Sequence, residues 1–378
     1  MAPVEPWKKV FVEQSFFETE HGEITCEDCH GGDPEAPGMD QAHQGLTSDP
    51  TFPDPTNVCG ECHEEITESA KNSLHYTLST YRPMMLKRAS KDPKIVAKID
   101  QGMKNHCYRC HSSCGQCHVS RPESVDGGLI SGHQFSAKPS MTEQCTACHG
   151  SRIGNEYLGK SGRGDVHFTK KQMDCMACHD SGLHNDTNEN MQNRYDAANL
   201  PRCETCHPPD EIYNNIEQHK VHGSKVQCQV CHSQKYANCT TCHVGQDGKG
   251  LSYFKNPETK MILKIGLNPR QSKKRPEKWV LLRRVPANPG LFDFYTKNAL
   301  TNFEDLATWK YTTPHNIQRK TYRSRECNNC HGNTKLFLTE KDVQFAEANR
   351  AVIVPEDKIP EKIKTTSKKK NKKKISYF

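Results

Sequence analysis

Residues 107 to 118 read CYRCHSSCGQCH, which places four cysteines and two histidines in twelve positions. Three kinds of site fit so tight a grouping: a zinc or iron–sulfur centre, a disulfide framework, or the covalent attachment of two porphyrins. The segment contains the pattern Cys-x-x-Cys-His twice, with the two histidines seven residues apart. The rest of the chain decides among the three.

The pattern occurs ten times in 378 residues, whereas chance would supply about 0.06 copies at this cysteine and histidine content. The ten copies use all 20 cysteines. A zinc site needs no histidine directly after its cysteine pair, and a disulfide framework has no reason to repeat the two-residue spacing ten times. Covalent attachment of c-type haem is therefore our interpretation, with two thiols added to the vinyl groups of one porphyrin and the histidine bound to its iron.

The interpretation predicts ten covalently bound haems, each with two attachment cysteines and one proximal histidine. The predicted attachment residues are Cys26, Cys29, Cys59, Cys62, Cys107, Cys110, Cys114, Cys117, Cys145, Cys148, Cys175, Cys178, Cys203, Cys206, Cys228, Cys231, Cys239, Cys242, Cys327 and Cys330. The predicted proximal iron ligands are His30, His63, His111, His118, His149, His179, His207, His232, His243 and His331.

Ten histidines remain outside the motifs, one for each iron. The equal numbers predict that each is a distal ligand, with methionine as the competing ligand type. His219 and His222 lie three residues apart, so we expect them to serve different haems. The sequence does not say which distal histidine reaches which iron. The predicted distal ligands are His21, His43, His75, His106, His133, His167, His184, His219, His222 and His315.

The composition is poor in core-forming residues, since only 33% of the chain is hydrophobic and its mean hydropathy is −0.87. Such a chain cannot build a large conventional core. We therefore predict a multihaem cytochrome c fold, mostly coil and short helices wrapped around a chain of haems. Residues 64–106 have the best helical pattern, which we expect Pro83 and Pro93 to break.

Three regions are predicted from the spacing of the motifs. Residues 1–243 form a haem-rich region with nine motifs, and residues 244–326 form an insert without a motif. We expect the insert to contain a small β element, with strands in MILKIGLN and KWVLLRRV and a short helix near NFEDLATW. Its ten basic residues between Lys255 and Arg284 would pair with haem propionates, recruit an anionic partner, or stay solvated. Residues 327–378 hold the tenth motif and a lysine-rich tail.

The charge distribution and the ends of the chain bear on location and partners. Residues 358–378 carry nine lysines and one glutamate, a local charge of +8. The formal charge of the whole chain is +7, so the remaining residues together carry −1. Propionates would make the rest acidic, which disfavours nucleic-acid binding and favours head-to-tail contact between copies. No run is long enough to span a membrane. Because APVEPWKK follows Met1 without an apolar signal, we expect these numbers to describe a mature exported chain, extracellular, at the cell surface or periplasmic.

The motifs between residues 21 and 331 resemble those of multihaem c-type cytochromes. The segments CGQCHVSRP at 114–122, CTACHGSRIGNEYLG at 145–159 and TWKYTTPHNIQRKT at 308–321 are similar to the octahaem tetrathionate-reductase and hydroxylamine-oxidoreductase-like group. The resemblance implies closely spaced haems, and some extracellular cytochromes of this kind form filaments. It also implies that His315 is a distal ligand, which we expect to serve the haem of Cys327 and Cys330 or a close neighbour.

The expected function is electron transfer through an exported decahaem conduit, with other redox proteins or extracellular acceptors as partners. No motif has lysine in place of histidine, and ten distal histidines would close all ten irons. One alternative remains an oxidoreductase that reduces a small nitrogen or sulfur oxyanion at one open haem. Another is a haem-bearing structural or storage module. We assign no catalytic residue.

Overall fold

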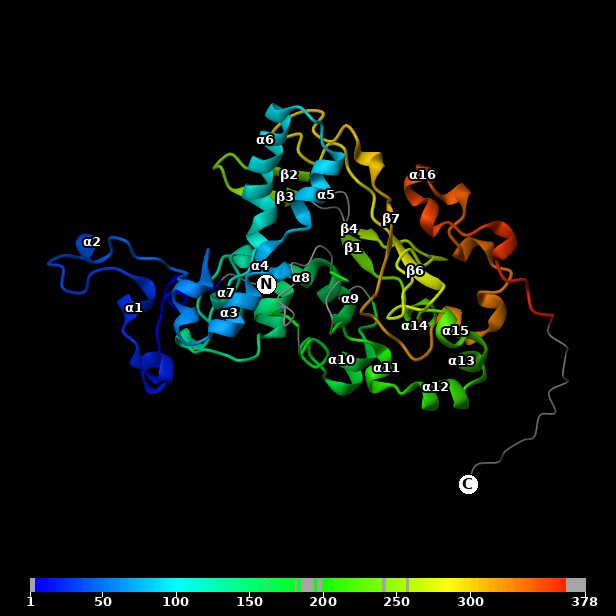
Figure 1. Ribbon diagram of the computed structural model, residues 1–378, viewed down its shortest axis with the longest axis horizontal. Coiled ribbons are helices and arrows are strands. Elements are labelled where there is room, and N and C mark those ends of the chain that lie inside the picture. Colours follow the sequence, from blue (N-terminus) through cyan, green and yellow to red (C-terminus); the bar gives the residue numbers. More distant parts are fainter. Residues whose placement is uncertain are drawn as a thin grey trace, which may run out of the picture.

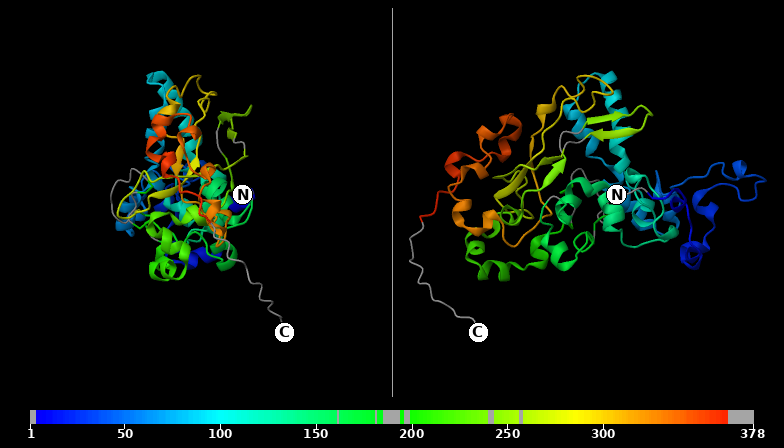
Figure 2. Two further views of the ribbon diagram at one scale, coloured as in Figure 1. Left: turned by 90° about the vertical axis from the view of Figure 1, so that its right-hand side faces the viewer. Right: turned by 180° about the vertical axis from the view of Figure 1, so that it is seen from behind.

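The computed structural model describes residues 4–160, 162–180, 182–184, 194–195, 199–239, 243–255 and 258–364. The amino-terminal helices α1 (Cys26–His30) and α2 (Met39–Ala42) project at one end of an elongated molecule (Figure 1). The carboxy-terminal segments, drawn in orange and red, lie at the opposite end, and the view from behind shows the same arrangement (Figure 2).

Short helices and coil dominate the described chain, as predicted, and the longest helix has ten residues. Many helices consist of little more than one motif, because attachment residues recur too often for long helices to form between them. The remaining α-helices are α3 (Glu64–Ala70), α4 (Leu74–Thr77), α5 (Tyr81–Arg88), α6 (Pro93–Gly102), α7 (Cys114–His118), α8 (Thr146–His149), α9 (Asn155–Leu158), α10 (Val166–Lys171), α11 (Cys203–Cys206), α12 (Pro209–Asn215), α13 (Glu217–His222), α14 (Cys228–His232), α15 (Tyr322–Arg325) and α16 (Ala346–Asn349).

The helical pattern of residues 64–106 is interrupted before Pro93, as expected, but not at Pro83. Pro83 is the third residue of α5, and Pro93 is the first residue of α6. Proline is tolerated in the first turn because the backbone N–H groups there have no partner within the helix. The expectation of a break at Pro83 is therefore wrong, since α5 continues through it to Arg88.

Three π-helical turns lie beside the attachment motifs. They span Met103–Cys107, Met141–Cys145 and Gly150–Gly154. A π-turn holds one residue more than an α-turn and is found mostly at functional sites. Here the turns come directly before two motifs and directly after one of them.

The predicted β element is present in residues 244–326. Strands β5 (Leu263–Leu267) and β6 (Trp279–Arg284) pair antiparallel, and β7 (Trp309–Tyr311) adds to the other side of β6. The segment near NFEDLATW forms only a 3-10 turn at Phe303–Asp305. Two further antiparallel pairs join β1 (Ala237–Cys239) to β4 (Glu258–Lys260) and β2 (His243–Gln246) to β3 (Ser252–Lys255).

Most of the conventional hydrophobic core lies in and after the insert. Sixteen of the 24 buried hydrophobic residues come after His243, although the region before it is nearly two thirds of the chain. One cluster packs Val230 and Tyr236 against Leu263, Leu281 and Phe337. The haem-rich region thus contacts the insert and the carboxy-terminal segment but buries few apolar side chains of its own.

In the described parts of the chain, every helix is too short or too polar to cross a lipid bilayer.

Candidate cofactor sites

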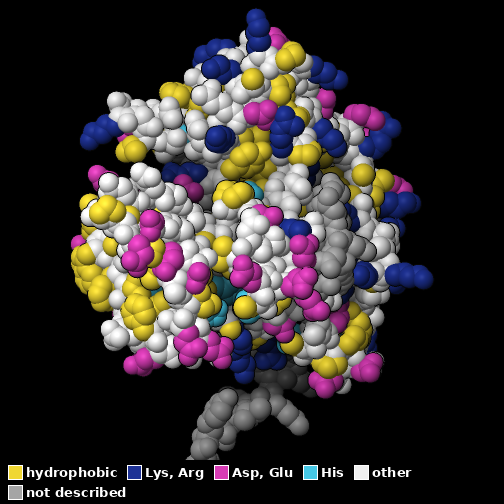
Figure 3. Space-filling model, turned by 60° about the vertical axis from the view of Figure 1, so that its left-hand side comes forward, with side chains coloured by type: hydrophobic (Ala, Val, Ile, Leu, Met, Phe, Trp, Pro, Cys, Tyr) yellow, Lys and Arg dark blue, Asp and Glu magenta, His cyan; other side chains and the backbone are white. Residues whose placement is uncertain are grey.

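A cavity of about 4910 Å³ extends between the motifs. Ordinary ligand pockets measure about 300–1,000 Å³, so this cavity is several times larger than a site for one small ligand. Seventeen of the predicted attachment cysteines and seventeen of the 20 histidines line it. In the space-filling view, imidazoles are visible inside hollows of one face (Figure 3).

Several motifs adopt helical turns, whereas the motif at Cys239 begins at the end of β1 and its His243 is the first residue of β2. Four motifs coincide with or begin α1, α7, α11 and α14, and another occupies the 3-10 turn at Cys327–Asn329. Residues three and four apart lie on the same face of a helix. In the eight motifs whose histidine lines the cavity, the two thiols line it as well, as attachment to one porphyrin would require.

Eight pairs of imidazole rings lie across the cavity from one another among the described residues. Each pair joins one motif histidine to one other histidine, and no histidine belongs to two pairs. The ring centroids are 5.8–6.4 Å apart. The pairs are His63 with His21, His30 with His133, His149 with His75, His118 with His184, His207 with His167, His179 with His315, His232 with His219, and His331 with His222.

This spacing fits two imidazoles on opposite faces of one iron. A metal–nitrogen bond is about 2 Å and the nitrogen lies about 1.1 Å from the ring centre, so the two centroids would be about 6.2 Å apart. A direct hydrogen bond of about 2.9 Å between the two rings would bring the centroids to about 5.1 Å. All eight observed distances exceed that second value.

The hydrogen bonds of several rings select the tautomer whose Nε2 could bind a metal. In seven histidines of these pairs, Nδ1 lies 2.6–3.3 Å from an oxygen that can only accept a hydrogen bond. Nδ1 must therefore carry the proton, which leaves the Nε2 lone pair free for a metal. The seven are His30, His118, His167, His219, His222, His232 and His331.

Burial keeps several of these imidazoles in the neutral form that a metal ligand needs. Burial, followed by the neighbouring His75, lowers the pKa of His149 to about 4. Burial is also the main cause of the lowered pKa of His75, His179 and His232. Removal from water disfavours the charged imidazolium, because the cavity wall is a poor substitute for hydration.

Two buried carboxylates stand behind distal histidines. Asp165, which is 2% exposed, accepts a hydrogen bond from Nδ1 of His167 at 2.8 Å and another from the backbone N–H of Ile317 at 2.7 Å. Glu156, 3% exposed, lies 3.5 Å from Nδ1 of His315. A carboxylate behind a ligating imidazole orients the ring and makes it more basic. Motif analysis missed both residues, although Asp165 precedes His167 by only two positions.

Four histidines fall outside the eight pairs. Nε2 of His106 lies 2.8 Å from the hydroxyl of Tyr295, and Nε2 of His243 lies 2.6 Å from Nδ2 of Asn288. His111 packs edge-on against Phe52 and Tyr76 at 5.1 and 5.5 Å. His43 is exposed and follows α2 at the projecting end of the molecule (Figure 1). Cys242 and the side chain of Cys239 lie outside the described residues.

The pairing corrects one expectation and agrees with another. His315 faces His179, not His331, so the insert reaches the motif at Cys175 and not the one at Cys327. His331 faces His222 from α13. His219 on the same helix faces His232, so these two histidines do reach different motif histidines.

Contacts between thiols show which motifs are neighbours. Four pairs of thiols from different motifs lie close enough to shift each other's pKa: Cys59 with Cys114, Cys110 with Cys148, Cys145 with Cys175, and Cys203 with Cys228. A thioether sulfur is two bonds from its macrocycle, so porphyrins attached at such contacts would have edges within roughly 10 Å of each other.

Electrostatic effects between other thiols connect these pairs into one series, and one such link is the effect of Cys145 on Cys117. Burial, and then the thiol of Cys59, raises the pKa of Cys29. Burial, and then Cys206, raises the pKa of Cys178, while burial and then Cys231 raise the pKa of Cys330 to about 11. Thioethers do not titrate, so only the proximity applies after attachment. The motifs therefore follow one order along the molecule. Named by the first cysteine of each, the order is Cys26, Cys59, Cys114, Cys145, Cys175, Cys203, Cys228 and Cys327. The motif at Cys107 lies beside the motif at Cys145, through Cys110 and Cys148.

The described side chains contain no group of three or more His, Cys, Asp and Glu residues placed to hold a metal ion among themselves. Instead, the imidazoles meet in pairs across the cavity. No protein-family model, curated protein or solved structure matches this chain.

Proposed function

We propose that the protein is an exported decahaem c-type cytochrome that conducts electrons along a row of haems. The observation that carries the proposal is the set of eight imidazole pairs, each joining a motif histidine to another at the spacing of two axial ligands. The pairs support bis-histidine coordination at eight haems. Two further haems belong to His111 and His243, whose sixth ligands the pairs do not assign.

The order of neighbouring motifs supports a conduit. Electron transfer needs short gaps between cofactors, and each step in the order is a contact or close approach between thiols of two motifs. The row would run from the projecting amino-terminal end to the carboxy-terminal end (Figure 1). The motif at Cys107 would form a side branch at Cys148.

The roles of the polypeptide follow from its contacts. Haem supplies the one-electron chemistry when bound. Acceptors on Nδ1 hold seven of the paired rings and present their Nε2. Asp165 and Glu156 add negative charge behind two distal imidazoles, which would stabilise the oxidised state of those haems relative to the others.

The side branch supports a second candidate function. His111 lies against Phe52 and Tyr76, and its haem has no distal histidine in the eight pairs. A haem with an open position could reduce a small nitrogen or sulfur oxyanion. Binding of one nitrite or sulfite per chain, seen as a shift in the haem spectrum, would favour this oxidoreductase over a pure conduit.

The mass and the spin state of the purified protein test the proposal. We expect the mass of the chain plus ten haems, and a ferric spectrum in which at least eight haems are low-spin, because two imidazoles give a strong ligand field. Mass spectrometry and magnetic circular dichroism measure the two quantities. A chain with fewer than ten haems, or with more than two high-spin haems, would contradict the proposal.

We also propose that copies associate head to tail at the cell surface or beyond it. The lysines of residues 358–378, most of which lie outside the described residues, would contact the propionate-rich body of the next copy. Deleting residues 358–378 should leave ten haems and abolish assembly in light scattering at low and physiological salt. A full-length protein that stays monomeric in both conditions would rule this out.

A further inference from the structure

A cluster of positive charges lies in the wall of the cavity beside the motif of His149. Arg283 on β6 and Lys310 on β7 belong to the insert, whereas Arg152 belongs to the π-turn after α8. All three line the cavity together with Arg194. The insert therefore contributes cations to a site built mainly by the haem-rich region.

Arg283 is one of the three buried arginines among the described residues. Its side chain is 6% exposed, the guanidinium hydrogen-bonds to Tyr236, and Nε is buried with no hydrogen-bond partner in the described structure. Its neighbour Arg284 points to the other face of the strand and is exposed. Arginine stays protonated in proteins, so burial without an anion leaves an expensive charge.

The cations of the cluster repel one another. Burial, followed by Arg283 and Arg194, lowers the pKa of Arg152 to about 10. Burial, followed by Arg88 and Arg270 outside the cluster and then Arg194 within it, lowers the pKa of Lys310 to about 8. Glu156 is the carboxylate that acts on Arg152, and it also lies beside His315. One shared carboxylate does not balance these charges.

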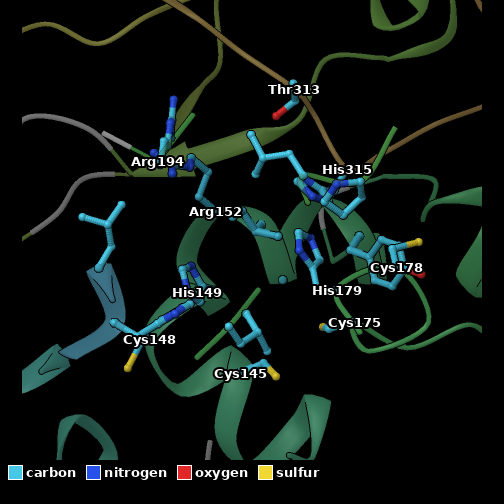
Figure 4. A pocket seen from close by; sticks show the side chains of 18 of the residues that line it. Cys145, Cys148, His149, Arg152, Cys175, Cys178, His179, Arg194, Thr313 and His315 are labelled. Carbon is cyan, nitrogen blue, oxygen red and sulfur yellow. The ribbon is translucent and has the colours of Figure 1, made fainter. Parts of the chain in front are cut away.

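The same imbalance extends around the cavity, whose described wall contains 17 Lys and Arg residues against eight Asp and Glu residues. Each haem brings two propionates, on the half of the macrocycle opposite its thioethers. Figure 4 shows Cys145 and Cys148 on one side of His149, and Arg152 and Arg194 on the other. The cluster thus lies where the carboxylates of a haem attached at Cys145 and Cys148 would be.

We propose that Arg283, with Arg152 and Lys310, binds the propionates of the haem attached at Cys145 and Cys148. The proposal rests on the decahaem function above. It explains why the insert returns to the haem-rich region, since its strands β6 and β7 supply the counter-charge. It also means that Arg283, a cation of the insert, binds a carboxylate inside the molecule and not an external partner.

Redox titration of Arg283→Gln tests the proposal, with Arg284→Gln as the matched control on the exposed face. Loss of the guanidinium leaves a propionate uncompensated and favours ferric iron. We expect the midpoint of one haem to fall by about 59 mV, a tenfold change in its oxidation equilibrium. A redox-difference infrared band of a carboxylate should shift as well, and Arg283→Lys should restore most of both. If Arg283→Gln lowers the yield of folded protein, Lys310→Met gives the same readout.

The other outcomes separate this proposal from the general function. Ten haems with potentials equal to those of the Arg284→Gln control would overturn the propionate site alone. Absence of haem from the wild-type chain would overturn both. Titration with inorganic phosphate tests whether the cluster binds a free oxyanion. A saturable spectral change in the wild type that Arg283→Gln abolishes would assign the cluster to such an anion instead.

Discussion

Serine at both Cys145 and Cys148 is expected to prevent the protein from folding, whereas the same change at Cys26 and Cys29 should remove one haem and little else. Cys145 and Cys148 interact with thiols of three other motifs, through Cys110, Cys117 and Cys175. Each 100 Å³ of enclosed cavity left empty costs about 2.4 kcal/mol, so an empty haem site at the centre of these contacts would remove much of the stability of a typical domain, about 5–15 kcal/mol.

The two double variants form a matched pair because each removes one porphyrin. The motif at Cys26 lies at the projecting end, where Cys29 approaches only Cys59 among the interactions described above. Haem content per chain and limited proteolysis report the outcome. We expect Cys26→Ser/Cys29→Ser to retain nine haems and resist proteolysis. Recovery of Cys145→Ser/Cys148→Ser with nine haems and the same melting temperature would show that the cavity is not a shared core.

His315→Ala should convert one haem of ten to the high-spin state, and that haem should be the one attached at Cys175 and Cys178. His315 faces His179 at 6.4 Å, and it is the only histidine of residues 244–326. Removing it leaves an iron with one imidazole. A high-spin ferric resonance that integrates to one haem, and binding of one carbon monoxide per reduced chain, measure the change.

His43→Ala is the control for His315→Ala, because it also removes a histidine that we first expected to be a distal ligand. The ring of His43 is exposed and lies outside the eight pairs. We expect its spectrum to match that of the wild type. An equal high-spin signal in both variants would mean that the ring pairs do not report iron ligation, and an unchanged spectrum in His315→Ala would make His315 a bystander.

The local sequence around each histidine did not predict which histidine it faces. His21 and His222 each precede a motif in a similar His–Gly segment, which indicates a repeated device. Yet His21 faces His63 and His222 faces His331, so neither serves the motif that follows it. In seven of the eight pairs the two histidines are 40 or more positions apart in the sequence, whereas His219 and His232 are 13 positions apart.

Residue type predicted the strands of the insert but not their purpose. The alternation in KWVLLRRV places Arg283 and Arg284 on opposite faces, and only burial against Tyr236 and the cavity distinguishes them. Similarly, Asp165 and Glu156 are ordinary acidic residues in the sequence. Their position behind His167 and His315 depends on α9 and α10 lying beside the returning segment around Ile317.

The sequence alone established that the chain has ten Cys-x-x-Cys-His motifs, which side chains these motifs place together, and that the region before His243 would bury little apolar surface. These properties are local, because the spacing of two cysteines and a histidine lies within one helical turn and composition limits the core. Only the tertiary structure decided which histidines face each other, in what order the motifs lie, and that Arg283 enters the cavity. Those relations join residues tens to more than a hundred positions apart, which the chain brings together only by folding around a shared cavity.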